Sequence, residues 1–281
     1  MHGFYRVAAA APVIRVADIS YNAERIITMI REAELEHAAV VVLPEMSLTG
    51  YTCGDLFHQS TLLQAAENAL LRIAAETAGF KVVAIIGAPL VRDNAVYNCG
   101  FVLHEGRILG IVPKVYNPNY REFYEKRWFK SGADVGCSTV EFKGREIPFG
   151  TDLIFSHDRY LRFGLELCED LWGVIPPSSW HCIAGATLTF NLSASNELVA
   201  KADYRRELIR QQSARCISGY VYASSGVHES TQDLVFGGHL LIAENGRTAA
   251  ENGRFQRNDE IIYADIDCQR LLYSRISESS Y

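Results

Sequence analysis

Residues 165–172, LELCEDLW, place a cysteine where an apolar run gives way to a polar turn. The apolar run at residues 161–167 predicts a buried strand, and a side chain at the end of such a strand is held rigidly. In open α/β proteins, ligands bind in the crevice at the carboxyl ends of the strands. Cys168 is therefore the first candidate for chemistry in this chain.

Two further apolar runs end in a charged residue. Residues 40–44, VVVLP, lead to Glu45, and residues 108–113, ILGIVP, lead to Lys114. A thiol, a carboxylate and an ammonium group that meet at one sheet edge can act as nucleophile, general base and oxyanion stabiliser. Each residue alone is more often structural, because a cysteine in an apolar run is usually a buried hydrophobe.

Other constellations are weaker. Cys53 follows Glu45 in a loop and is a second candidate nucleophile. The eight histidines show no metal-ligand spacing such as HExxH, and no GxSxG, GxGxxG, GxxxxGK[ST] or SGGxDS motif occurs. These absences argue against a metal site, a serine hydrolase and a nucleotide-binding loop.

The composition excludes several classes of protein. A net charge of −6 and a pI of about 5.8 argue against a partner that is nucleic acid. No apolar run is long enough for a membrane helix, and the first residues lack the pattern of a signal peptide. The seven cysteines are scattered without a CxxC pair, which favours a reducing, cytoplasmic location.

Strand and helix patterns alternate along all 281 residues, which we interpret as one layered α/β domain, 1–281, with mixed sheets. Strands are expected at 5–12, 40–43, 82–87, 97–103, 107–112, 139–142, 153–155, 161–167, 188–192, 221–223, 240–243 and 261–266. Helices are expected at 22–37, 62–78 and 204–218. Glu105-Gly106 predicts a hairpin turn, and residues 244–246 are expected to join the last two strands. The segment 114–136 is long enough for a functional loop.

The longer motifs resemble a known family. Residues 43–51, LPEMSLTGY, with Pro113-Lys114 and residues 167–170, LCED, resemble the Glu-Lys-Cys signature of the nitrilase (carbon–nitrogen hydrolase) superfamily. Residues 119–129, NYREFYEKRWF, and 191–196, NLSASN, are similar to the glutaminase domain of glutamine-dependent NAD+ synthetases. The resemblance covers nearly the whole chain.

This resemblance implies a four-layer αββα sandwich that assembles as a homo-oligomer. It implies hydrolysis of the glutamine side-chain amide to glutamate and ammonia, a step that needs no cofactor and no metal. The ammonia would pass to a synthetase domain, which uses ATP and magnesium to convert deamido-NAD+ to NAD+. Because that domain's motifs are missing here, the chain is expected to be either an excised domain or a free-standing enzyme.

The resemblance also assigns roles to residues. Cys168 would be the nucleophile, Glu45 the general base and Lys114 the oxyanion stabiliser. Glu125 would be the supporting carboxylate, with Glu122 as the alternative. The expected lining of the glutamine pocket is Tyr51, Tyr120, Glu169, Trp172, Ser195 and Lys201, the last at a position where some members carry Arg.

The glutamine pocket also makes sense from charge alone. Free glutamine carries an α-carboxylate and an α-ammonium group, so its pocket needs one cation and one anion. Lys201 and Glu169 can provide them, while Tyr51 and Tyr120 can cover the aliphatic stem. Two alternatives to a glutaminase remain open: an amidase or carbamoylase of the same superfamily, and a non-catalytic assembly module of the same fold.

Overall fold

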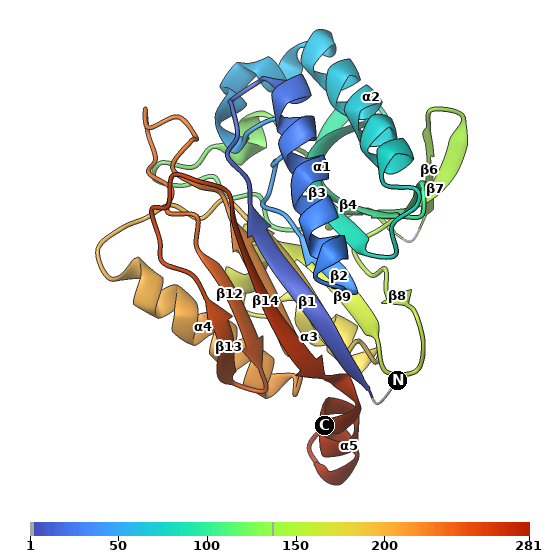
Figure 1. The fold of residues 1–281 in the computed structure, drawn as a ribbon. Helices are drawn as coiled ribbons and strands as arrows, with labels where there is room; N and C mark the ends of the chain where they lie inside the picture. Colours follow the sequence, from blue (N-terminus) through green and yellow to red (C-terminus); the bar gives the residue numbers. More distant parts are fainter. Residues whose placement is uncertain (1–2, 137) are drawn as a thin grey trace.

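Two mixed β-sheets packed face to face form the centre of the molecule, in a computed structural model that describes residues 3–136 and 138–281 (Figure 1). The larger sheet has eight strands in the order β14-β1-β2-β3-β4-β5-β7-β6. Its strands are β1 (Phe4–Ala11), β2 (Val40–Val42), β3 (Val83–Arg92), β4 (Ala95–His104), β5 (Arg107–Pro113), β6 (Ser138–Phe142), β7 (Arg145–Phe149) and β14 (Glu260–Asp267). Strands β1, β2 and β3 are parallel, so their carboxyl ends share one edge.

The smaller sheet has six strands in the order β13-β12-β11-β10-β9-β8. Its strands are β8 (Phe155–Ser156), β9 (Arg162–Leu167), β10 (Leu188–Ser193), β11 (Gly219–Ser224), β12 (Leu240–Glu244) and β13 (Arg247–Glu251). Strands β9, β10 and β11 are parallel. Cys168 follows the last residue of β9 directly, as the sequence predicts.

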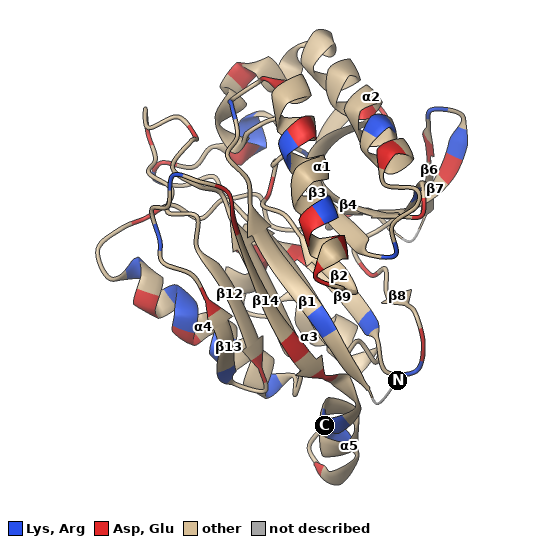
Figure 2. Cartoon of the chain, in the orientation of Figure 1, with Lys and Arg blue, Asp and Glu red and all other residues tan. Residues whose placement is uncertain are grey.

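In the described part of the chain, α1 (Ile19–Leu35) and α2 (Ser60–Glu76) cover the larger sheet, and α3 (Pro177–Ile183) and α4 (Lys201–Arg215) cover the smaller one. Helix α5 (Cys268–Ser277) extends beyond the end of β14 (Figure 1). Three short 3₁₀ segments lie at Tyr51–His58, Glu125–Arg127 and Cys168–Trp172. Helices α1 and α4 present both signs of charge on their outer faces (Figure 2). Among the described residues, no helix is both long and apolar enough to cross a membrane.

Strand alternation separates the buried side chains into layers. On β1, Val7 and Ala9 pack between the two sheets, whereas Ala8 and Ala10 face the layer of α1 and α2. On the far side, Ile209 of α4 packs with apolar residues of β11 and β12. Because side chains in a strand point alternately to opposite faces, a strand covered on both sides must be apolar throughout. The predicted four-layer αββα sandwich is confirmed.

Three expectations about strands are wrong. The turn at residues 244–246 leads into β13, and the predicted last strand, β14, instead pairs antiparallel with β1 in the other sheet. Strand β13 has no apolar face, and β7 was not expected either. The strand predicted at 153–155 is reduced to the two residues of β8. Strands β14, β13 and β8 lie at sheet edges, where burial does not impose an alternating pattern, whereas β7 lies between β5 and β6.

The two sheets meet where the parallel strands end. After β2 the chain turns across β3, and the backbone N–H of Glu45 donates to the carbonyl oxygen of Ser193, which ends β10, at 3.2 Å. Gly87 of β3 allows this crossing, because a Cβ there would lie 2.4 Å from the backbone nitrogen of Met46. The crossing brings Glu45 to the strand end that carries Cys168.

Candidate active site

Cys168 occupies a strained turn between β9 and the 3₁₀ segment Cys168–Trp172. Its φ of +44° lies in the left-handed region, which costs a residue other than glycine on the order of 1 kcal/mol. The turn directs the thiol into a cavity, although only 6% of the residue is exposed. Strain at one reactive side chain is typical of functional sites.

Asp170 holds this turn in place. Its buried carboxylate accepts hydrogen bonds from the backbone N–H groups of Leu167 at 2.9 Å, Val115 at 3.1 Å and Tyr116 at 2.8 Å. The carboxylate therefore joins the segment after Lys114 to the residue before Cys168. Asp170 belongs to the LCED motif at residues 167–170, but no sequence pattern assigns it this role.

Lys114 lies at the centre of a buried cluster of charges. Its Nζ is 2.6 Å from Oε1 of Glu45 and 2.7 Å from Oε1 of Glu125, and all three side chains are at most 1% exposed. Asn98 donates to Glu45 at 2.5 Å, and the Tyr51 hydroxyl donates to Glu125 at 2.7 Å. Glu45 and Lys114, 69 residues apart in the sequence, thus meet as predicted from their strand ends.

One cation cannot neutralise two buried carboxylates. Burial raises the pKa of Glu125 to about 7, with Lys114 opposing the shift and Glu45 adding to it. Burial also disfavours the charge on Lys114, but the two carboxylates hold the pKa of that ammonium group well above its ordinary value. The second oxygens of Glu45 and Glu125 have no hydrogen-bond partner among the described residues. Each is a buried acceptor that can take a proton.

The Cys168 thiol is protonated at neutral pH. Burial and, next, the Glu45 carboxylate raise its pKa to about 12, while the charge on Lys114 opposes the shift. A thiol with this pKa is a poor nucleophile until a base removes its proton. The arrangement therefore favours proton transfer during attack over a preformed thiolate.

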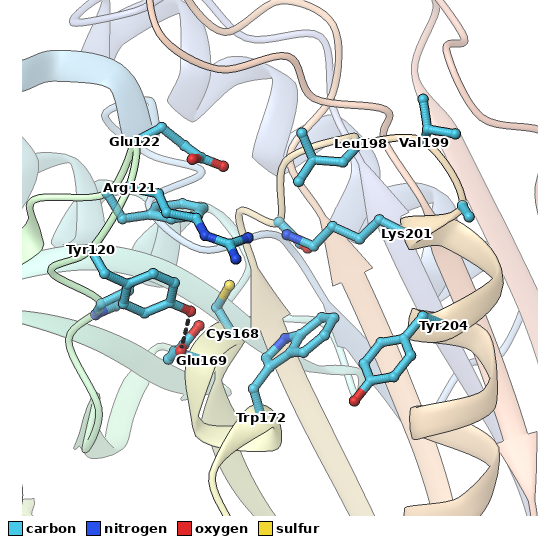
Figure 3. Close-up of a pocket in the computed structure, with 14 residues that line it drawn as sticks. Tyr120, Arg121, Glu122, Cys168, Glu169, Trp172, Leu198, Val199, Lys201 and Tyr204 are labelled. Atoms are coloured by element: carbon cyan, nitrogen blue, oxygen red, sulfur yellow. Dashed lines mark hydrogen bonds between the residues drawn. The ribbon is translucent and has the colours of Figure 1, made fainter.

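The cavity above Cys168 has a volume of about 590 Å³ and opens to solvent (Figure 3). From the predicted pocket it includes Tyr120, Glu169, Trp172, Ser195 and Lys201. The Tyr120 hydroxyl donates to Glu169 at 2.6 Å, and Trp172 stacks on Tyr204 with 5.3 Å between ring centroids. The Lys201 ammonium lies 5.3 Å from the Trp172 ring centroid. This volume accommodates a small polar substrate.

Two hydrogen bonds fix Ser195 in the wall of the cavity. Its hydroxyl accepts from the buried guanidinium of Arg205 at 3.1 Å, and its backbone N–H donates to Ser224 at 3.2 Å. Arg205 also contacts Glu197 at 2.6 Å. The hydroxyl of Ser195 is thus fixed at the cavity wall.

Tyr51 does not line this cavity, contrary to the expectation that it covers the substrate. Its hydroxyl faces Glu125, and the residue borders a second cavity of about 280 Å³. Buried Glu229 fixes it by accepting from the Tyr51 backbone N–H at 2.7 Å. Tyr51 therefore supports the charged cluster. The sequence could not show which side of the cluster its ring occupies.

The two candidates for the supporting carboxylate lie in different places. Glu125 contacts Lys114, whereas Glu122 lies at the cavity wall and accepts from Asn196. Cys53, the second candidate nucleophile, lies outside the cavity lining and donates to the carbonyl oxygen of Thr49 at 3.1 Å. The structure thus brings Glu125, and not Glu122, to the cluster around Lys114, and it keeps Cys53 out of the cavity lining.

Asn98 is a residue that the sequence analysis missed. It is fully buried in β4, where its side chain contacts Glu45 and its carbonyl oxygen accepts from the backbone N–H of Lys114 at 2.8 Å. An asparagine inside the apolar run of residues 95–103 was the available signal. Among the described residues, no group of three or more His, Cys, Asp or Glu side chains is placed to hold a metal ion.

Two relatives that match nearly all of this chain have the same name. The chain is 41% identical to a glutamine-dependent NAD(+) synthetase of Mycobacterium tuberculosis (strain ATCC 25618 / H37Rv), over all of this chain and 41% of that protein. It is 29% identical to the synthetase of the same name from Aquifex aeolicus, over 95% of this chain and 44% of that protein. The chain thus spans about two fifths of the length of these relatives.

Solved structures agree. A glutamine-dependent NAD(+) synthetase from Cytophaga hutchinsonii superposes with a TM-score of 0.85 and 30% identity, over 94% of this chain and 43% of that one. An amidase of the nitrilase superfamily from Nesterenkonia AN1 shares the fold, with a TM-score of 0.75 and 17% identity over 98% of this chain and 95% of that one. Residues 6–272 match the sequence pattern of carbon–nitrogen hydrolases. The chain therefore belongs to the carbon–nitrogen hydrolase family.

Proposed function

We propose that this chain hydrolyses the side-chain amide of glutamine through a thioester on Cys168, releasing glutamate and ammonia. The observation that carries the proposal is a thiol that lines a cavity of charged and aromatic side chains, beside a buried Glu45–Lys114–Glu125 cluster. Relatives matched over the whole chain are named glutamine-dependent NAD(+) synthetases, which supports glutamine as the substrate.

The first half of the reaction forms the thioester. Glu45 takes the thiol proton as the sulfur of Cys168 attacks the amide carbon, and the carbonyl oxygen becomes an oxyanion. The Lys114 ammonium and the backbone N–H of Glu169 stabilise that oxyanion. Glu45 then gives its proton to the departing nitrogen, the carbon–nitrogen bond breaks, and ammonia leaves.

The second half reverses the proton transfers. Glu45 takes a proton from water, the hydroxide attacks the thioester carbon, and the same donors stabilise the second oxyanion. When the carbon–sulfur bond breaks, the proton returns to the sulfur and glutamate is released. Glu125 keeps Lys114 charged throughout, because its carboxylate oxygen contacts the ammonium at 2.7 Å.

We also propose the setting of this reaction. The ammonia serves a synthetase domain that uses ATP and magnesium to make NAD+ from deamido-NAD+, while the hydrolysis itself uses only the side chains described. The six described cysteines are free, which supports a reducing cytoplasm. Exposed apolar side chains in α3 and just before it, with Trp180 61% and Val174 95% exposed, support association of copies into a homo-oligomer.

A panel of amides tests the proposal. We expect kcat/KM for glutamine to exceed that for simple aliphatic amides by about 10²–10⁴-fold, because charged groups in the cavity recognise both α-substituents. Ammonia release is measured for glutamine, asparagine, propionamide and an N-carbamoyl amino acid. High turnover of propionamide with none of glutamine would instead assign a general amidase, and turnover of none would leave a non-catalytic module.

A further inference from the structure

One cation that lines the cavity, Arg121, takes no part in the buried Glu45–Lys114–Glu125 cluster. Four charged side chains line the cavity: Arg121, Glu122, Glu169 and Lys201. Glu169 accepts from Tyr120, and Asn196 accepts from Lys201 while donating to Glu122. Within the described part of the chain, the guanidinium of Arg121 makes no hydrogen bond or ion pair.

The backbone aims this guanidinium inward. Arg121 has a φ of +51°, a left-handed conformation that disfavours a long side chain. Its side chain enters the cavity from the 114–136 segment, whereas Lys201 enters from the start of α4. Figure 3 shows the two cationic groups pointing toward each other above Cys168. A strained backbone that points an unpaired cation over a nucleophile suggests a binding role.

Arg121 and Lys201 can together bind one anion, in a cavity that the carboxylates of Glu122 and Glu169 also line. Like charges that converge repel each other unless an anion lies between them, and a carboxylate there is attracted by both. The planar guanidinium can donate two parallel hydrogen bonds to one carboxylate, which the ammonium group of lysine cannot do.

We propose that Arg121 binds the α-carboxylate of the substrate as a bidentate partner, with Lys201 as the second contact. The site then selects amides that carry an anion several atoms from the reacting carbon over neutral amides of equal length. The identity of that anion as glutamine's carboxylate rests on the proposed function. The preference for an anion does not, because it rests on the unpaired guanidinium of Arg121 facing Lys201, and not on the net charge of a lining that holds two cations and two carboxylates.

The test compares two chloromethyl ketones of equal chain length that alkylate Cys168. One ends in a carboxylate at the position of glutamine's α-carboxylate, and the other ends in a methyl group. We expect Arg121→Gln to slow alkylation by the anionic reagent by about 10- to 100-fold and to leave the rate for the neutral reagent unchanged. Arg121→Lys should recover part of the lost rate.

Arg127→Gln is the matched control. Arg127 lies in the same segment and is exposed, but its guanidinium pairs with Asp55 at 2.6 Å, outside this cavity. It removes the same charge and should leave both alkylation rates unchanged. Thermal unfolding of each variant checks that the fold is kept.

Two outcomes of the alkylation test would overturn the proposal: Arg121→Gln slowing both reagents equally, which is a structural effect, or slowing neither. A failure of the proposed function can be distinguished from a failure of the anion site. If the wild-type protein prefers the anionic reagent but releases no ammonia from glutamine, the anion site stands and the substrate is wrong. If glutamine is hydrolysed with the same KM in Arg121→Gln, the glutaminase stands and Arg121 has no binding role.

Discussion

Replacing Cys168 with alanine will lower ammonia release from glutamine by about 10⁴-fold or more. Without the sulfur no thioester can form, and water has to attack the amide directly beside a base and oxyanion donors that remain. The loss is expected in kcat, since the cavity that binds glutamine keeps every other lining side chain. Ammonia is measured by a coupled assay at saturating glutamine.

Cys53→Ala is the control for Cys168→Ala. Both cysteines are buried, and burial raises the pKa of each thiol to about 12, so chemical type and protonation state are matched. Only Cys168 lines the cavity. Cys53→Ala should therefore keep activity within about threefold of wild type, because its thiol does not touch the substrate. Full activity in Cys168→Ala, with the fold intact by circular dichroism, would refute the nucleophile.

Glu45→Gln will lower kcat by about 10²–10⁴-fold, the usual contribution of a positioned general base. Glutamine can keep an oxygen toward Lys114 and Asn98, which contact Oε1 of Glu45, so the cluster loses its proton acceptor more than its packing. The substitution also removes a negative charge beside the thiol. Because that charge helps to raise the pKa of Cys168, the thiol should titrate at lower pH in the variant.

These two effects have opposite signs, which makes Glu45→Gln informative. Turnover should fall while alkylation of Cys168 by a neutral reagent above pH 8 becomes faster, because a larger fraction of the thiol is ionised. A pH series of alkylation rates, read by mass spectrometry, measures the shift. A fall in turnover with an unchanged or raised pKa of the Cys168 thiol would mean that Glu45 stabilises the fold and does not accept the thiol proton.

The central strands and the meeting of Cys168, Glu45 and Lys114 can be predicted from the sequence, because all of them follow from the burial of apolar runs. Apolar runs such as residues 40–43 and 161–167 must be buried, and charged residues directly after them must lie at a sheet edge. This reasoning placed Glu45 and Lys114 near Cys168 without any distance information. Edge strand β13 could not be predicted in this way, because nothing in its exposed residues distinguishes a strand from a loop.

The supporting contacts were beyond sequence reasoning for a different reason. Whether Tyr51 faces the substrate or Glu125 depends on how the 3₁₀ segment after Gly50 docks, and buried Glu229, 178 residues away, decides that. Arg121 lies in a long loop, where neither its left-handed backbone nor the direction of its side chain can be predicted. Such details arise from tertiary contacts that leave no periodic pattern in the chain.

Covalent labelling with a glutamine analogue tests the central claim most directly. The reagent is a chloromethyl ketone that keeps glutamine's α-ammonium and α-carboxylate groups and replaces its amide. We predict one adduct per chain, mapped by peptide mass spectrometry to Cys168, with ammonia release lost in proportion to labelling and protection by glutamine. Inactivation with the adduct on Cys53, or stoichiometric labelling of Cys168 that leaves glutamine hydrolysis intact, would contradict the account.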